Sequence, residues 1–245
     1  MHRFFVKPEA FSDETVTLDG TDVNHIRNVL RMNTGDRILV LDGQGWQYSI
    51  QLEEIGRDHV VGRVLDRKEY SSESPVQIWM GQALIKGNRF DNLVRKSVEL
   101  GVSAIAPLET RRSVARIRPD EAPRKIERWQ RIADEASKQC GRTRVPPVQD
   151  SILDIQGFVD LVRDCELKLA FWESETRTRL QDIETPQSLK SLAFVAGPEG
   201  GWAPEEIDQL QQAGFQTVQL GPRILRADSV SQVILALLQH RWGDL

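Results

Sequence analysis

Three apolar segments of the chain end in residues that favour turns, and these ends could hold a small molecule. Residues 192–196 pass into Gly197-Pro198-Glu199-Gly200-Gly201, residues 215–220 pass into Gly221-Pro222-Arg223-Ile224-Leu225-Arg226, and residues 167–171 end at Trp172-Glu173. Glycine lets a ligand approach the main chain because it has no Cβ. Ligands of open α/β sheets bind outside the carboxyl ends of the strands, so the three ends could converge on one ligand. The alternative is that each is only a tight turn between a strand and a helix.

Strands and helices must alternate for these ends to meet. Apolar runs that favour strands and stretches of helical periodicity follow one another after residue 75. The strands are expected at 76–80, 105–108, 167–172, 192–196 and 215–220, and the helices at 89–100, 123–139, 155–163, 204–212 and 228–240. Such alternation predicts an α/β domain with a mostly parallel sheet. The last helix carries an apolar stripe that is either core or a dimer face, formed by Val230, Val233, Ile234, Leu237 and Leu238.

The first seventy residues have a different pattern, typical of a small β-barrel. Short β-branched and apolar runs occur at 4–6, 16–18, 37–41, 48–52 and 60–65. A helix at 22–30 is expected between the second and third runs, with Thr21 as its cap and with Val23, Ile26, Val29 and Leu30 on its inner face. The polar, serine-rich stretch 70–75 is the best linker. It divides the chain into domains at 1–72 and 73–245.

Composition narrows the class of protein further. The 245 residues are 40% hydrophobic and 28% charged, which is typical of a globular protein and excludes a disordered or collagen-like chain. No apolar run approaches the roughly 18 residues of a membrane span. The 2 cysteines and 4 histidines are scattered, so neither a disulfide framework nor a metal site is expected. A cytoplasmic protein is the resulting expectation.

The charge is unevenly distributed along the chain. Residues 86–147 contain 15 basic and 8 acidic residues, although the whole chain has a net charge of −4. A basic segment of this kind could contact a polyanion such as RNA, and arginine forks suit phosphate oxygens. The alternative is that these side chains form solvated helix faces that pair with the acidic C-terminal third. The arginines concerned are Arg111, Arg112, Arg116, Arg118, Arg124, Arg128, Arg131, Arg142 and Arg144.

Several motifs, in order along nearly the whole chain, resemble the RsmE family, the bacterial methyltransferases that modify N3 of a uridine in 16S ribosomal RNA. The two glycine turns described above carry the resemblance most specifically. The other matching segments are His25-Ile26-Arg27-Asn28-Val29-Leu30-Arg31, the stretch from Lys86 through Lys96-Ser97-Val98-Glu99-Leu100-Gly101-Val102 to Pro107, Arg128-Trp129, Glu135-Ala136-Ser137-Lys138-Gln139-Cys140-Gly141-Arg142, and Pro146.

The resemblance implies a fold, a cofactor and partners. It implies an N-terminal PUA-like β-barrel that binds RNA and a C-terminal SPOUT domain, an α/β fold with a deep trefoil knot. It further implies a homodimer through the SPOUT domain that acts on 16S rRNA within the 30S subunit during ribosome biogenesis. The cofactor would be S-adenosyl-L-methionine. Its implied contacts are Phe171, Trp172, Glu173, Gly197, Pro198, Glu199, Gly200, Leu220, Gly221, Ile224, Leu225 and Ser229.

One segment departs from the family. Many members follow the Ile-Leu-Arg run with Thr-Glu-Thr-Ala, whereas this chain has Ala227-Asp228-Ser229-Val230. The change keeps an acid and a hydroxyl, and Asp228 could cap the following helix. Cofactor contacts at 228–230 are the ones that this departure affects.

The chemistry of N3 methylation suggests roles for four side chains. N3 of uracil must lose a proton before it attacks, and the resulting negative charge spreads onto O2 and O4. An arginine could stabilise that charge, and the candidates are Arg142, Arg223 and Arg226. Glu199 could accept the proton or orient the base. Trp129, Trp172 and Trp202 could stack on a base or on adenine, although packing in the core is the more common role of tryptophan.

Two other functions fit the same residues. One is a SPOUT methyltransferase with another RNA target, such as a ribose 2′-hydroxyl. The other is a non-catalytic RNA-binding assembly factor, which the basic segment 86–147 would support without a cofactor.

Overall fold

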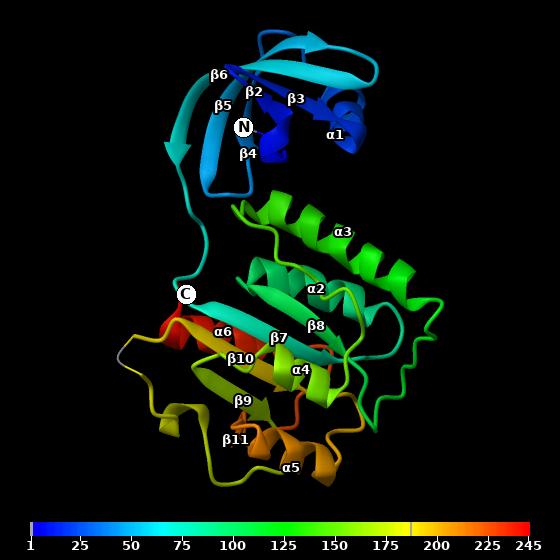
Figure 1. The fold of residues 1–245 in the computed structure, drawn as a ribbon, viewed down its shortest axis with the longest axis vertical. Coiled ribbons are helices and arrows are strands. Elements are labelled where there is room, and N and C mark those ends of the chain that lie inside the picture. Colours follow the sequence, from blue (N-terminus) through cyan, green and yellow to red (C-terminus); the bar gives the residue numbers. More distant parts are fainter. Residues whose placement is uncertain (1, 187) are drawn as a thin grey trace. The chain divides into compact units, whose positions relative to one another are not determined.

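The computed structural model of the protein describes residues 2–186 and 188–245, which form two compact units (Figure 1). The N-terminal unit comprises Met1–Glu73 and Ser137–Val145, and the C-terminal unit comprises Ser74–Ala136 and Pro146–Leu245. The short segment 137–145 thus belongs with the first unit, although it lies far along the chain.

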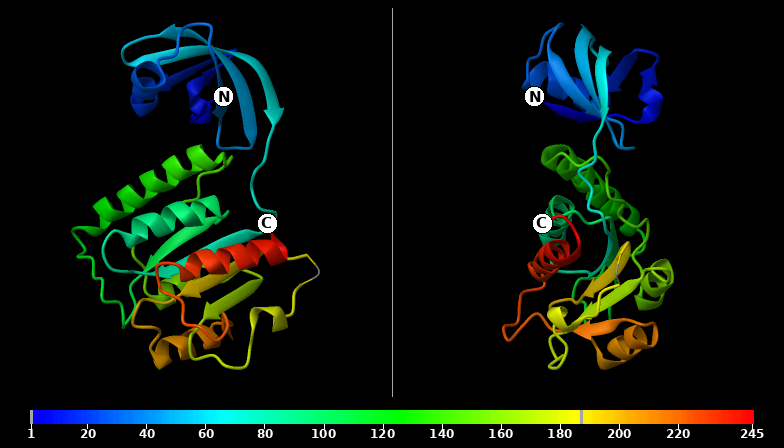
Figure 2. Two further views of the ribbon diagram at one scale, coloured as in Figure 1. Left: turned by 180° about the vertical axis from the view of Figure 1, so that it is seen from behind. Right: turned by 90° about the vertical axis from the view of Figure 1, so that its left-hand side faces the viewer.

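The N-terminal unit is built on a six-stranded sheet in the order β1-β4-β5-β6-β3-β2. Only β1 and β4 pair in parallel, and the other pairs are antiparallel. Alternate strand residues such as Val16 and Leu18 are buried, so one face of the sheet encloses an apolar core. The sheet curls around this core in both views of Figure 2. The strands are β1 Arg3–Phe5, β2 Phe11–Ser12, β3 Thr15–Asp19, β4 Arg37–Leu41, β5 Trp46–Ile55 and β6 His59–Glu69.

The helix expected at 22–30 is present, but two of its details differ from the expectation. It starts as α1 at Gly20–Asn24 with Asp19 as the cap, so Thr21 lies inside the first turn. A π-helical turn, His25–Val29, follows directly. Because a π turn accommodates an extra residue, it rotates the side chains that follow. Val29 is therefore 64% exposed rather than on the inner face, whereas Val23 and Ile26 are buried as expected.

The C-terminal unit contains a five-stranded sheet that is parallel throughout, in the order β11-β9-β10-β7-β8. The expectation of an α/β domain with a mostly parallel sheet is confirmed. Its strands are β7 Gln77–Ala83, β8 Ala104–Leu108, β9 Leu167–Phe171, β10 Ser191–Ala196 and β11 Gln216–Val218. The helices are α2 Arg89–Glu99, α3 Ala122–Cys140, α4 Ile155–Leu161, α5 Pro204–Gln212 and α6 Val230–Trp242.

Helices cover both faces of this sheet. Helices α4 and α5 lie on one face and α2 and α6 on the other (Figure 2). On the first face Phe158 and Trp202 belong to an apolar cluster that includes residues of β8, β9 and β10. On the second face Ser231 of α6 donates a hydrogen bond to the buried Gln82 of β7. The sheet is thus fixed from both sides, and only the ends of its strands are available for a site.

The start of α6 also differs from the expectation. Its N-cap is Ser229, and Asp228 does not cap it. The Asp228 carboxylate instead faces the guanidinium of Arg226, with the Nε–Oδ1 distance 3.3 Å. Within residues 2–186 and 188–245, no helix has the length and apolar character needed to cross a membrane.

Candidate active site at the ends of three parallel strands

The three turn segments singled out in the sequence meet in the structure. Strands β9, β10 and β11 are neighbours, and their register pairs Ala196 and Val218 with Phe171, so the carboxyl ends of the three strands are level. The turns that follow surround a pocket of about 730 Å³. Pockets of 300–1,000 Å³ are typical of sites for small molecules and cofactors.

Main chain forms much of the wall of this pocket, because glycines occupy the turn after β10. A Cβ on Gly200 would lie 2.9 Å from the main-chain oxygen of Arg112, and one on Gly197 would lie 3.1 Å from Nε1 of Trp202. Gly201 has a φ of +67°, a conformation that favours glycine, and its amide donates to the Pro198 carbonyl at 3.0 Å. A Cβ at Gly200 would therefore displace the turn or the main chain beside it, and one at Gly197 would press on the buried Trp202 ring.

The pocket lining includes most of the residues expected to contact a ligand. Of the expected cofactor contacts, only Ser229 is absent from the lining. Ile224 belongs to the lining, yet its side chain is 85% exposed. Of the four expected catalytic side chains, three line the pocket, namely Glu199, Arg223 and Arg226. The structure therefore brings these residues together, and their roles stay predictions.

Arg89 also lines the pocket, although it was not among the expected site residues. It begins α2, and all other lining residues come from the three turns or the strand ends and helix start next to them. Its Nη1 lies 3.8 Å from Oε1 of Glu199, and its Nε lies 3.7 Å from Oδ2 of Asp228. The amide of Lys86 donates to the same Glu199 oxygen at 3.0 Å. The sequence signal that could have indicated Arg89 is its position within the Lys86-to-Pro107 motif.

Acidic and basic side chains both line the pocket. The acids are Glu173, Glu175, Glu199 and Asp228, and the bases are Arg89, Arg223 and Arg226. Burial alone would raise the pKa of Glu175, but hydrogen bonds from Thr217 and from nearby backbone amides outweigh it and lower that pKa. Among the described residues Arg223 forms no ion pair, so its charge is available to a ligand.

Comparisons with known proteins identify the family. Residues 72–239 match the family model described as an RNA methyltransferase domain, and residues 18–65 match the one described as an RNA methyltransferase PUA domain. The chain belongs to this RNA methyltransferase family. The resemblance to the RsmE family is confirmed by relatives named ribosomal RNA small subunit methyltransferase E.

Two relatives and one solved structure illustrate how far the similarity extends. The Bacillus subtilis relative is 30% identical over 98% of this chain and 97% of its own length. The Synechocystis relative is 35% identical over 96% of this chain and 76% of its own length. The crystal structure of ribosomal RNA small subunit methyltransferase E from Neisseria gonorrhoeae, bound to S-adenosyl methionine, is 35% identical, has a TM-score of 0.90, and covers 100% of this chain and 99% of that one.

Arg142, the fourth expected catalytic side chain of this RNA methyltransferase, does not line the pocket. It belongs to the N-terminal unit, where it is buried and forms an ion pair with Glu73. Glu73 also accepts hydrogen bonds from the amides of Thr143 at 2.9 Å and Arg144 at 3.0 Å. Burial alone would raise the pKa of the Glu73 carboxyl, but Arg142 and these two amides hold that pKa below its ordinary value. In this structure Arg142 fixes a turn.

Two of the three tryptophans considered as stacking platforms are core residues. Trp129 packs against Phe90 with ring centroids 4.3 Å apart, and Trp202 is 2% exposed and donates to the Phe171 carbonyl at 3.0 Å. Trp172 lines the pocket.

Several arginines of the basic segment form ion pairs with acids. Arg111 lies 3.4 Å from Glu205 of α5, and Arg116 pairs with Glu109. The Arg111 pair matches the alternative that the basic side chains pair with the acidic C-terminal third, whereas Arg116 pairs with an acid of its own segment. Arg111 and Arg116 stay exposed, and the expectation of an RNA-facing surface remains a prediction.

Proposed function

We propose that this RNA methyltransferase uses S-adenosylmethionine to methylate N3 of a uridine in 16S ribosomal RNA of the small subunit, expected to be uridine 1498. Family membership supports methyl transfer to RNA, and the relatives named small subunit methyltransferase E support the choice of ribosomal RNA. The observation that carries the proposal is the pocket at the carboxyl ends of β9, β10 and β11.

The pocket fits the cofactor by its volume, its backbone and its charge. Its volume of about 730 Å³ suits a ligand of this size. Gly197 and Gly200 have little room for a Cβ beside Trp202 and Arg112, so the turn that lines the pocket needs glycine there, and its main-chain amides and carbonyls are available to the edges of an adenine ring. The acids among the lining residues suit a cationic sulfonium. The residues that would hold the cofactor are Phe171, Trp172, Glu173, Gly197, Pro198, Gly200, Leu220, Gly221, Ile224 and Leu225.

When bound, the cofactor supplies an electrophilic methyl group. The chain must then generate and hold a deprotonated uracil. Glu199 is the proposed proton acceptor, because its carboxylate lines the pocket and is fixed by the Lys86 amide and by Arg89. Arg223 and Arg226 are proposed to stabilise the negative charge that spreads onto O2 and O4. Positioning contributes most of the remaining rate enhancement.

The SPOUT fold with a deep trefoil knot is part of this proposal. Helix α6 contacts β7 through Ser231 and Gln82. Near its other end, Arg241 donates to carbonyls of Leu180 and Ile183, and Trp242 donates to Thr185 at 2.9 Å. These three residues belong to the connection between β9 and β10. Contact of the C-terminal helix with both β7 and this earlier connection supports a threaded chain.

Separate roles for two domains, and a homodimer, complete the proposal. Residues 1–72 would bind RNA as a PUA-like domain, which the PUA family match supports, and residues 73–245 would carry out methyl transfer.

Val233 and Leu237 lie one turn apart on α6 and are 38% and 39% exposed, which supports a dimer face. When both residues are changed to Glu, light scattering should give the mass of a monomer instead of a dimer. The cytoplasmic location and the role in ribosome biogenesis remain predictions.

Nucleoside analysis tests the proposed reaction. Purified protein and labelled S-adenosylmethionine are incubated with 30S subunits that lack the native modification, and the digested RNA is analysed by mass spectrometry. Labelled 3-methyluridine is the expected product. A methylated ribose or another base would replace the proposed target with a different RNA site. Absence of label, together with absence of cofactor binding in calorimetry, would favour a non-catalytic assembly factor.

A further inference from the structure

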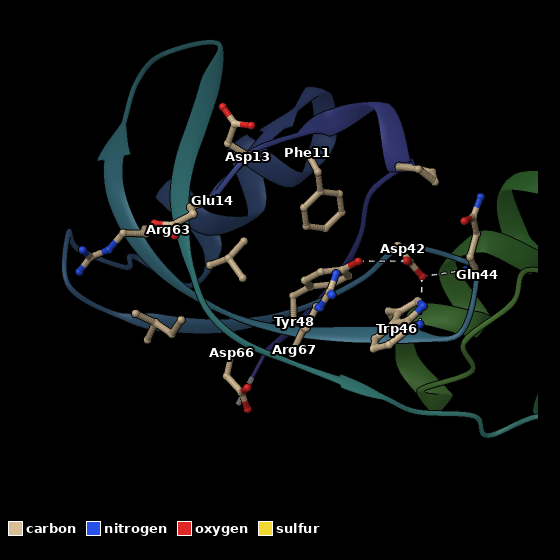
Figure 3. Close-up of a pocket in the computed structure, with 13 residues that line it drawn as sticks. Phe11, Asp13, Glu14, Asp42, Gln44, Trp46, Tyr48, Arg63, Asp66 and Arg67 are labelled. Carbon is tan, nitrogen blue, oxygen red and sulfur yellow. Dashed lines mark hydrogen bonds between the residues drawn. The ribbon is translucent and has the colours of Figure 1, made fainter.

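The N-terminal unit contains a second concave site, which lies on the curled sheet (Figure 3). It has a volume of about 900 Å³, and we call it the aromatic bowl. Its inner side chains come from β2, β5, β6 and the turn before β5, and they are Phe11, Asp42, Trp46, Tyr48 and Arg67. Charged residues surround them, namely Asp13, Glu14, Arg63 and Asp66.

The aromatic side chains of the bowl are held in fixed positions. The rings of Phe11 and Tyr48 are 4.3 Å apart, and the Tyr48 hydroxyl points toward Asp42 and donates to it at 3.3 Å (Figure 3). Asp42 is only 7% exposed and accepts the amides of Gln44 at 2.8 Å and Trp46 at 3.1 Å. Burial and the neighbouring Asp42 raise the pKa of Tyr48, so its hydroxyl stays a donor. The bowl is thus preorganised for a ligand.

A guanidinium already stacks inside the bowl. Cζ of Arg67 lies 5.1 Å from the centroid of the Trp46 ring, within the range of a cation–π contact. The register of β5 and β6 places Arg67 opposite Tyr48, so the same cation also lies beside the second aromatic ring. Trp46 is 37% exposed, and its ring has surface left for another contact. The contact of Arg67 with Trp46 therefore shows that this ring can accept a guanidinium.

The charge around the bowl selects against an anion. Asp13, Glu14 and Asp66 are exposed, and within the described residues none of them forms an ion pair. Arg63 points away from the aromatic rings in Figure 3, and its Nε lies 3.2 Å from Glu53. Asp13 and Asp66 also lie at the rim in Figure 3, with their carboxylates turned away from the rings, so the three acids act on an incoming ligand through their negative potential. That potential disfavours a phosphate and, together with the ring faces, attracts a cation.

We propose that the aromatic bowl binds an arginine side chain from a basic segment of a protein partner. The incoming guanidinium stacks on Trp46 and Tyr48, and the rim carboxylates of Asp13, Glu14 and Asp66 attract the basic segment that carries it. Arg67 is the intramolecular competitor for the same ring surface. This site is separate from the methyl-transfer pocket in its residues and in its ligand chemistry, and it does not depend on the proposed reaction.

Calorimetric titration of the 245-residue protein with a nona-arginine peptide tests this site. The rim variant combines Asp13→Asn, Glu14→Gln and Asp66→Asn, and asparagine also tolerates the φ of +50° at position 13. The control variant removes three exposed acids of the same unit that lie outside the bowl and do not pair with its lining residues, through Asp19→Asn, Glu54→Gln and Asp58→Asn. The two variants have the same net charge. We expect the rim variant to weaken binding about tenfold and the control about twofold at most.

For a second variant we expect the affinity for the peptide to change in the opposite direction. Arg67→Gln removes the competitor and one like charge, so the peptide should bind more tightly than to the wild type. Equal weakening by the rim and control variants would overturn the proposal, because it would indicate only general attraction to an acidic surface. No measurable binding to the wild type would overturn it as well. Oligouridylate is titrated in parallel: if Trp46→Ala weakens RNA binding and leaves peptide binding unchanged, the bowl recognises a nucleobase instead.

Discussion

The pocket of the C-terminal unit and the aromatic bowl of the N-terminal unit are both concave, but different parts of the chain form their walls. Turns after parallel strands wall the pocket, and side chains are missing at Gly197 and Gly200 where they would clash. Side chains from antiparallel strands wall the bowl, and a buried carboxylate, Asp42, fixes its turn. The pocket therefore depends on residues that have no side chain, whereas the bowl depends on a few specific side chains.

A carboxylate holds a turn at two places in the N-terminal unit, at Asp42 and at Glu73, and the largest predicted effect comes from Glu73. Arg142→Ala leaves the largely buried Glu73 carboxylate, 16% exposed, without its ion-pair partner. Breaking such a pair lowers the free energy of unfolding by about 3–5 kcal/mol. Urea denaturation should show this loss, while Arg144→Ala should have a small effect, because that side chain is exposed and its amide remains.

The Arg142→Ala variant also distinguishes a structural role of Arg142 from a catalytic one. If Arg142 only fixes the turn, methylation per folded molecule stays close to the wild-type rate in the variant. A variant that keeps its stability and loses methylation would instead restore Arg142 as a catalytic residue.

The Glu73 ion pair also predicts a pH dependence. Because the pKa of Glu73 is lowered in the folded state, its contribution to stability is present above the ordinary carboxyl pKa of 4.5 and is lost as the pH falls toward the folded value. The difference in unfolding free energy between the wild type and Glu73→Gln should therefore shrink as the pH falls below 4.5. A difference that stays constant between neutral and acid pH would contradict this assignment.

The next largest effect should come from the glycine turn of the pocket. A Cβ on Gly200 would lie 2.9 Å from the main-chain oxygen of Arg112, so Gly200→Ala must displace the turn. We expect the affinity for S-adenosylmethionine to fall about 100-fold, or about 2.8 kcal/mol. Gly214→Ala is the control, because Gly214 has a φ of +86° but open space around it, and it lies outside the pocket lining. If calorimetry finds equal losses of affinity, the effect is general destabilisation.

The difference between the two sites also explains what the sequence could predict. Strand ends followed by glycine and proline are visible in a linear sequence, and the parallel sheet brings them together at its edge, so most of the pocket lining was predictable. Helix α5, Pro204–Gln212, was predicted with correct bounds, because proline and two acids mark its start.

Features that depend on tertiary neighbours were not predictable. The bowl arises from the register of β5 and β6, which sets Tyr48 opposite Arg67, and no local pattern fixes that register. Val29 is exposed because a π turn shifts the helix phase. Arg142 was expected at the reaction site because arginine suits anions, but its burial against Glu73 is a property of the folded chain.

The smallest predicted effect concerns the side chain that enters the pocket from outside the three turns. Arg89 lies near both Glu199 and Asp228, at 3.8 Å and 3.7 Å, and its side chain is 46% exposed. Because the main chain forms the pocket, Arg89→Gln should leave cofactor affinity and stability close to wild type. We expect kcat to fall about tenfold, since Glu199 loses a neighbour that positions it.

Arg89→Lys should recover part of that rate, because the charge returns without the guanidinium fork. Arg95→Gln, an exposed site on the same helix, is the matched control and should leave kcat unchanged. If Arg89→Gln instead weakens cofactor binding as strongly as Gly200→Ala, the pocket depends on side chains as the bowl does, and the contrast between the two sites is lost. If kcat does not change, Glu199 is held by the Lys86 amide alone, and Arg89 is a surface residue of the pocket.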